Sequence, residues 1–284
     1  MKKLETIVFL VVGLLFLAAC THISPSWHLK ASEFDTLPNS IGDITVQHDA
    51  PFDLSEYNKI SMRSEYEATT EYEDPTDKWV LKGGVISSGL HLPGDEIQIQ
   101  LKHLSNGPRI RYQLTERNAS LEKVGIVKEE ISTNQQFKTD LPDKEGALYL
   151  LSAEVLDLNY GVEDTLLTLV EVPLQAINAK LYTDKEEYRS YDSLILQLEN
   201  FGPTTLSFGV DYSIEKFENG LWKSLVFENM GFASIGIEVQ PHDIFEQPVD
   251  LPRLPQGKYR IVKSFSADGT KLDATLAADF EVIK

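Results

Sequence analysis

The residue of this chain best suited to covalent chemistry is Cys20, the only cysteine among 284 residues. It closes the run Leu17-Ala18-Ala19-Cys20, which follows two lysines and an apolar stretch from residue 7 to residue 16. A charged start, an apolar centre and small residues before the cleavage point are the three parts of a secretory signal, and the cysteine makes the last part a lipobox. The sequence therefore predicts a signal peptide at residues 1–19, cleavage before Cys20 and attachment of lipid to its sulfur.

The length of the apolar stretch decides how the chain meets a membrane. It is too short for the roughly 20 residues of a spanning helix, which disfavours a transmembrane anchor. An ordinary secretory signal that happens to end in Ala-Ala-Cys is the alternative, but it leaves a lone thiol on an exported chain unexplained. Two or three acyl chains of the palmitate type at Cys20 suffice for stable anchoring. We therefore expect a lipoprotein held on the extracytoplasmic face of the cell membrane.

The charge balance limits the partners of the exported body. The chain carries 26 Lys and Arg against 44 Asp and Glu, a formal net charge of −18, and loss of Lys2, Lys3 and Glu5 with the signal changes it to −19. Nucleic-acid binding depends on basic residues that neutralise phosphates, and anionic lipid repels an acidic body. We expect no nucleic-acid partner, a membrane contact through the lipid, and an unknown protein or cell-wall partner. Without a second cysteine no disulfide forms, so each domain depends on its own core.

Other patterns that could support catalysis or metal binding are weak. The stretches 84–89 and 231–236 approach a serine elbow, but each has two residues between the first glycine and the serine, and neither precedes a helical pattern. The chain has no phosphate loop or dinucleotide fingerprint. The histidines lack the close pairing of a zinc site; they are His22, His28, His48, His91, His103 and His242. The sequence predicts no catalytic residue, no metal and no cofactor, although only geometry would identify a glycosidase-like pair of carboxylates.

An acidic segment and two tryptophans are the remaining candidates for ligand contact. Residues 65–77 carry six carboxylates with Tyr66 and Tyr72 and no apolar stripe, which is typical of an exposed loop or a charged edge hairpin. A cation site is the sharper hypothesis, but the alternating ligands and central glycine of a calcium loop are absent. Trp79 and Trp222 are candidates for stacking on a sugar; the alternative is that they fill a core or cover a sheet edge.

The elements that carry these residues are predicted to be strands. Residues 95–102 alternate apolar and polar side chains one by one, so Ile97, Ile99 and Leu101 should face a core. Asn219-Gly220 separates two strand-like runs and suits the two positive φ angles of a type I′ hairpin, and Asp268-Gly269 is expected to form a second one. No segment after the signal shows a sustained helical period. The fold class predicted is all-β, with antiparallel sandwiches.

An internal repeat predicts two sandwiches in tandem. Asp140-Leu141-Pro142 is followed by Tyr149, and Asp250-Leu251-Pro252 is followed at the same offset by Tyr259. Each tyrosine opens a strand, as in a tyrosine corner, where a buried ring returns its hydroxyl to upstream backbone. Lys263 is a misfit among the apolar positions of the second strand. We expect a lipid anchor and flexible tether at residues 20–40, an N-terminal sandwich at 41–173 and a C-terminal sandwich at 177–284.

Between Leu181 and Lys263 a set of spaced residues is typical of one family. The set is Tyr188; Leu194, Leu196 and Leu198 with Asn200 and Gly202; Phe208-Gly209 and residues 211–216; Asn219-Gly220 with Trp222; Val239 with Pro241; residues 249–251; and residues 257–262. In this order they resemble the immunoglobulin-like (Ig-like) domain of many exported bacterial proteins, especially lipoproteins of Gram-positive type. Such domains usually have a glycine after the proline that leads into the fifth strand, where this chain has His242. The resemblance implies an Ig-like sandwich in an exported setting and brings no catalytic residues.

Two classes of function are compatible with these patterns. The first is a membrane-anchored, non-enzymatic lipoprotein whose sandwiches bind a partner or act as a spacer in the cell envelope, with the loops at the sandwich ends as contact surface. The second is a β-sandwich that binds or hydrolyses cell-wall carbohydrate. A third possibility, a sporulation or stress-related envelope protein, describes a biological context and not a molecular mechanism.

Overall fold

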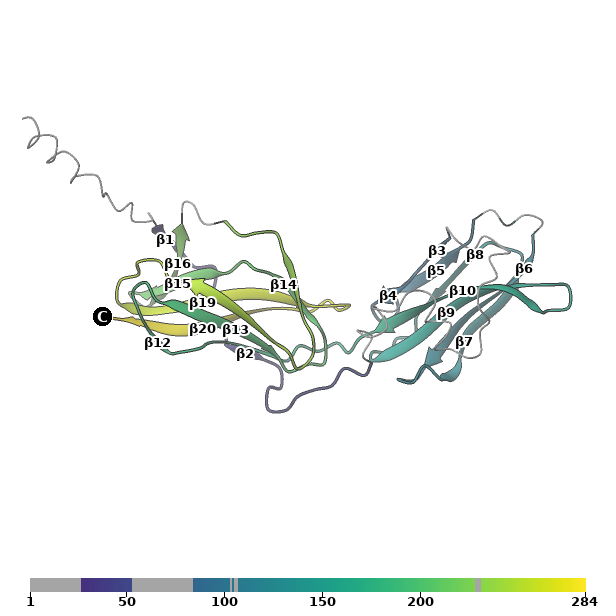
Figure 1. The fold of residues 1–284 in the computed structure, drawn as a ribbon, viewed down its shortest axis with the longest axis horizontal. Helices are drawn as coiled ribbons and strands as arrows, with labels where there is room; N and C mark the ends of the chain where they lie inside the picture. Colours follow the sequence, from purple (N-terminus) through teal and green to yellow (C-terminus); the bar gives the residue numbers. More distant parts are fainter. Residues whose placement is uncertain (1–26, 53–83, 103, 105–106, 228–230) are drawn as a thin grey trace, which may run out of the picture.

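The chain folds into two β-sandwiches that follow one another along the long axis of the molecule (Figure 1). The computed structural model describes residues 27–52, 84–102, 104, 107–227 and 231–284. Cys20, the acidic segment 65–77 and Trp79 lie outside these ranges. The described residues form strands and no helix, so the all-β prediction is confirmed.

The N-terminal sandwich consists of a five-stranded and a three-stranded sheet. The strand order is β4-β10-β9-β6-β7 in the larger sheet and β3-β5-β8 in the smaller one. Neighbouring strands are antiparallel except β4 and β10, which are parallel. The strands are β3 (Val85–Ile86), β4 (Gly89–Leu90), β5 (Glu96–Gln100), β6 (Arg109–Arg117), β7 (Lys123–Ser132), β8 (Gln136–Asp140), β9 (Ala147–Leu156) and β10 (Val162–Val172).

The core of this sandwich lies between its two sheets. Ile97, Ile99 and Leu101 are buried there, as their alternation predicts. Tyr112 of β6 stacks on Phe137 of β8 with 5.1 Å between ring centroids, which joins the two sheets. All ten residues of β9 are buried, and two of those on its outer face belong to a second apolar cluster. That cluster contains Leu121, Leu148, Leu150, Leu167 and Leu169.

The C-terminal sandwich consists of an eight-stranded and a four-stranded sheet. The larger has the order β1-β16-β15-β19-β14-β17, with β20 paired to β19 and to β12; the smaller has the order β18-β13-β11-β2. Only β12 and β20 pair in parallel among the described strands of this half. The strands from β11 onward are β11 (Ala179–Thr183), β12 (Glu187–Arg189), β13 (Ser193–Asn200), β14 (Leu206–Gly209), β15 (Ser213–Glu218), β16 (Leu221–Phe227), β17 (Gly236–Val239), β18 (Ile244–Asp250), β19 (Gly257–Ala267) and β20 (Asp273–Ile283).

Two turns of this sandwich test the hairpin predictions. Asn219 and Gly220 have φ angles of 55° and 82° and join β15 to β16, with Glu218 opposite Leu221, so a two-residue hairpin is confirmed. The prediction of a second two-residue hairpin at Asp268-Gly269 is wrong. Strands β19 and β20 close at Ser266 and Asp273, and the longer loop between them is bent by a bond from the Thr270 amide to the Ala267 carbonyl.

The expected flexible tether is in large part a structured piece of the C-terminal sandwich. Strand β1 (Trp27–Ala31) pairs with β16, and β2 (Ser40–Ile41) pairs with β11, so the segment adds one strand to each sheet. Further on, the His48 amide donates to the Phe201 carbonyl at 2.7 Å. Trp27 and Leu29 pack against the apolar core, which is the physical reason that this segment is held.

The domain limits expected from the sequence therefore need correction. The chain first runs along the C-terminal sandwich from residue 27 to residue 49, then builds the N-terminal sandwich up to Val172, and returns at Ala179. Residues 27–40 are not a loose spacer, and residues 41–49 belong with the C-terminal sandwich. The N-terminal sandwich is an insertion between the first two strands of its neighbour and the remaining ones.

Candidate functional site

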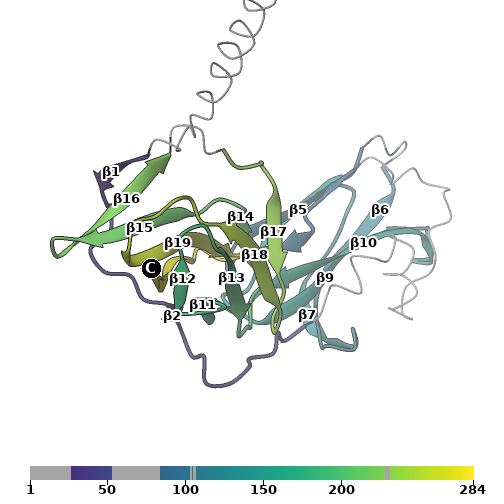
Figure 2. The ribbon, with the colours of Figure 1, turned by 60° about the vertical axis from the view of Figure 1, so that its left-hand side comes forward.

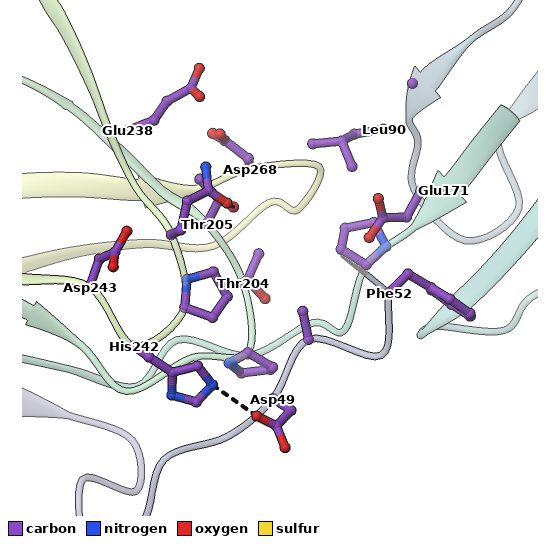
Figure 3. A pocket seen from close by; sticks show the side chains of 16 residues that line it. Asp49, Phe52, Leu90, Glu171, Thr204, Thr205, Glu238, His242, Asp243 and Asp268 are labelled. Carbon is purple, nitrogen blue, oxygen red and sulfur yellow. Dashed lines mark hydrogen bonds and ion pairs between the residues drawn. The ribbon is translucent and has the colours of Figure 1, made fainter. Parts of the chain in front are cut away.

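A cavity of about 620 Å³ lies where the two sandwiches meet (Figure 3). Its walls come from the loops and strand ends of both halves, which Figure 3 shows facing one another. The N-terminal half and the segments at the junction contribute Asp49, Ala50, Phe52, Gly89, Leu90, Glu171 and Pro173. The C-terminal sandwich contributes Pro203, Thr204, Thr205, Glu238, Gln240, Pro241, His242, Asp243 and Asp268.

Asn200 holds the wall on the side of the C-terminal sandwich. Its side chain is fully buried, and its amide nitrogen donates to the carbonyls of Thr204 and Val239, both at 2.9 Å. Its amide oxygen accepts from the Gly202 amide at 2.8 Å. One buried side chain therefore ties the turn after β13 to the end of β17, and a satisfied buried amide fixes a single loop geometry.

His242 connects this wall to the chain segment that leads to the N-terminal sandwich. Its φ of 73° is unusual for a residue with a Cβ and is a conformation that glycine adopts easily, in line with the glycine expected there from the resemblance. Its Nδ1 lies 2.8 Å from Gln47 Oε1, and its Nε2 lies 2.9 Å from Asp49 Oδ1. The departure from the family pattern thus supplies a ring that binds the segment entering the other half.

The charged side chains that line the cavity are mainly acidic. Five carboxylates line it, with no lysine or arginine among the lining residues, so the wall is electrostatically suited to a cationic group rather than an anionic one. Thr204 Oγ1 already donates to the Leu174 carbonyl, and Thr205 Oγ1 donates to Gln240 Oε1, both at 2.9 Å. Within the described residues no group of three or more His, Cys, Asp or Glu side chains could hold a metal ion.

The two tyrosines expected at corners behave differently. The Tyr259 hydroxyl donates to the Pro255 carbonyl at 2.7 Å, four residues upstream, while its ring is fully buried. The Tyr149 ring is equally buried, but its hydroxyl has no hydrogen-bond partner in the described chain. The expected corner at Tyr149 is therefore wrong, because the upstream backbone there does not reach the hydroxyl. Burial raises the pKa of Tyr259 to about 12.

Of the two candidate sugar-binding tryptophans, only Trp222 lies in the described part of the chain. The Arg260 guanidinium carbon lies 4.2 Å from the centroid of the Trp222 ring, and the Phe217 ring packs at 5.2 Å. These contacts give Trp222 a packing role on β16. Trp222 does not line the cavity between the sandwiches.

Three buried charged side chains of the C-terminal sandwich were not expected from the sequence. Arg260 and Glu215 form an ion pair at 2.6 Å, with each side chain only 2 % exposed. Lys263, the misfit of the second tyrosine strand, is also buried, and its Nζ donates to the carbonyls of Gly209 and Asp211 at 2.8 and 3.0 Å. Burial lowers the pKa of Lys263 to about 8, partly opposed by the charge of Asp211. The only sign of this group in the sequence is a lysine at an apolar position of a strand.

The comparisons with known proteins identify the second half of the chain. Residues 175–281 match the family model of the bacterial Ig-like domain. The chain thus carries an Ig-like domain in its C-terminal half, the type of fold typical of structural or binding modules rather than catalytic ones. The match begins after β1 and β2, so these two strands are additions at its N-terminal side.

No curated protein matches the chain. No helix of the described chain is long and apolar enough to cross a membrane.

Solved structures similar to the chain are distant. The fibronectin(III)-like modules of Clostridium thermocellum CbhA are 12 % identical with a TM-score of 0.30, over 70 % of this chain and 93 % of theirs. The chicken CNTN1 FN1–FN3 domains are also 12 % identical with a TM-score of 0.30, over 70 % of this chain and 66 % of that one. Red sea bream transglutaminase is 11 % identical with a TM-score of 0.25, and the match covers 78 % of this chain but only 33 % of the transglutaminase.

Proposed function

We propose that the chain is a lipoprotein, anchored through Cys20 to the extracytoplasmic face of the cell membrane, that serves as a non-enzymatic binding or structural module of the envelope. The cavity between the sandwiches is the observation that carries the binding role. It is built by loops of both halves, and loops on a rigid sheet scaffold are the usual place for recognition. Its partner is a protein or a cell-wall component whose contacting surface carries positive charge.

The lipid anchor is supported by the sequence around Cys20 and by the position of β1. The described chain begins at Trp27, on β1, close in sequence to Cys20, so an anchored protein would be held close to the bilayer through the C-terminal sandwich. Mass spectrometry of the protein from its native membrane tests this directly. We expect a diacylglyceryl group on an N-terminal Cys20, and Cys20→Ser should abolish both lipid and membrane retention. An unmodified thiol on a membrane-free protein would overturn the anchor.

The binding role is tested by cross-linking in intact cells followed by identification of the captured partner. Asp243→Asn and Glu238→Gln remove charge from the cavity wall, and both should weaken capture. Glu96→Gln is the matched control, because Glu96 is an exposed carboxylate of β5 that lies outside the cavity. Equal capture by all three variants would exclude the cavity as the contact surface.

A further inference from the structure

We propose that the exposed segment Gly231–Gly236 of the C-terminal sandwich is a membrane-contact loop that inserts Phe232 and Ile235 into the bilayer interface beside the lipid anchor. The proposal rests on lipidation of Cys20 and adds a second contact of the same protein with the same membrane. Its partner is the lipid surface itself.

Position along the fold places this loop at the same end of the sandwich as the start of the described chain. Trp27, the first described residue, pairs with Phe227, the last residue of β16. Because a residue spans at most about 3.6 Å, Cys20 can lie no more than about 25 Å from Trp27. By the same measure Gly231 lies within about 14 Å of Phe227. Figure 2 shows the start of β1, the end of β16 and the segment that leads into β17 at one end of the sandwich.

The composition of the loop suits a lipid surface. The six residues are Gly231, Phe232, Ala233, Ser234, Ile235 and Gly236, all exposed and all uncharged, in a chain whose formal net charge is −18. Phe232 is 39 % exposed and Ile235 is 53 % exposed. Acidic side chains would be repelled by an anionic leaflet, and their absence from this loop removes that cost.

An aromatic contact holds the loop against the rest of the sandwich. The Tyr212 ring packs edge-on against the Phe232 ring, with 4.9 Å between centroids. This contact supports one face of Phe232 and leaves the rest of the ring accessible. An aromatic ring and an aliphatic side chain on a supported loop are the groups that add interfacial affinity to a lipid anchor.

The single cysteine of the chain allows a direct test. One acyl chain gives only marginal, reversible membrane binding, so a single palmitoyl group coupled through a maleimide to Cys20 of the chain from Cys20 to Lys284 makes any second contact measurable. Partitioning is measured on vesicles of equal parts phosphatidylcholine and phosphatidylglycerol. We expect Phe232→Ser/Ile235→Ser to lower the partition coefficient about tenfold or more, the effect of losing buried apolar area.

Matched controls separate this contact from nonspecific hydrophobic adsorption and from misfolding. Leu158→Ser and Leu221→Ser remove apolar residues that are 89 % and 61 % exposed but lie elsewhere, and both should partition like the wild type. Ile235→Ser alone leaves the Tyr212–Phe232 contact intact and should still lower partitioning. Binding to vesicles should slow amide hydrogen exchange in residues 231–236 relative to the same protein free in solution.

The outcomes distinguish failure of the loop contact from failure of the anchor. Equal partitioning of the loop variants and the wild type would overturn the loop contact, even if native Cys20 carries lipid. A loop variant that changes self-association but not partitioning would do the same and would make a second copy the partner. A native Cys20 without lipid would overturn the proposed anchor, whatever the artificial tether shows.

Discussion

The Arg260 guanidinium and the Glu215 carboxylate form an ion pair that the N-terminal segment completes. Ser32 Oγ donates to Glu215 Oε1 at 2.6 Å, and Arg260 donates to the Phe34 carbonyl at 2.9 Å. The Trp222 ring covers the guanidinium. The segment between β1 and β2 thus adds two hydrogen bonds to a buried ion pair, which links the region next to the proposed anchor to the stability of the Ig-like half.

Removing one member of this pair should be strongly destabilising. A lone buried charge costs about 3–5 kcal/mol, so Glu215→Leu should lower the free energy of unfolding by that amount in urea titrations followed by tryptophan fluorescence. The double variant Glu215→Leu/Arg260→Met should lose less than the single one, because no buried charge is left alone. Glu96→Leu breaks the exposed pair with Lys138 and should cost at most about 1 kcal/mol. Equal effects of the two single variants would contradict the burial of the pair.

The two tyrosine hydroxyls provide a matched comparison. Tyr259→Phe removes a hydrogen bond to the Pro255 carbonyl and should cost about 1 kcal/mol. Tyr149→Phe removes a buried hydroxyl that has no partner in the described chain and should be neutral or stabilising. Thermal or urea unfolding of both variants measures the difference. A larger loss for Tyr149→Phe than for Tyr259→Phe would refute the assignment of the corner.

Lys263 should give stability a characteristic pH dependence. Its pKa is about 8 in the folded chain and 10.5 for the unperturbed group, so between these values the unfolded chain binds more protons. The free energy of unfolding of the wild type should therefore rise with pH from about 8 to 10.5, and this contribution is lost as pH falls through 8. Lys263→Met should lack the rise relative to the wild type. Lys258→Met, an exposed neighbour on β19, should keep it; a rise in Lys263→Met would exclude Lys263 as its source.

Gly202 should tolerate no side chain. A Cβ there would lie 1.9 Å from the His48 carbonyl oxygen, at a φ of 75°. Gly220 has a φ of 82°, and a Cβ added to it would meet no atom within 4 Å, so Gly220→Ala should cost only the backbone strain of about 1–2 kcal/mol. Gly202→Ala should cost clearly more in the same unfolding experiment, and proteolysis should then begin near His48. Equal losses would mean that the segment is free to move away.

Local sequence patterns are sufficient to predict the elements whose structure depends on residues that are neighbours in the sequence. Ile97 and Ile99 alternate with polar residues and face the core, and Asn219-Gly220 forms the turn that its two residue types favour. Strand β1 cannot be found in this way, because it has only five residues and its partner is β16, near the other end of the chain. The Asp268-Gly269 pair is misleading as a local signal, since the loop it belongs to packs on Leu90 and Pro173 of the other half.

The candidate site depends on tertiary contacts and has few signs in the sequence. Asn200 and His242 stand at positions of the family pattern, but the cavity exists only because the loops that contain them meet Leu90 and Glu171. Lys263 departs from an apolar pattern, and only the structure reveals the carbonyls that hold its Nζ. Features made by residues distant in the sequence need the assembled fold to be recognised.

The insertion of one sandwich into the other also sets the order in which the halves can be completed as the polypeptide is synthesised. Trp27 pairs with Phe227, so the Ig-like half cannot close its larger sheet until most of the chain has appeared. All described strand pairings of the inserted half lie between residues 85 and 172, and it can therefore collapse first. Until β16 is made, β1 has no strand partner in the Ig-like half.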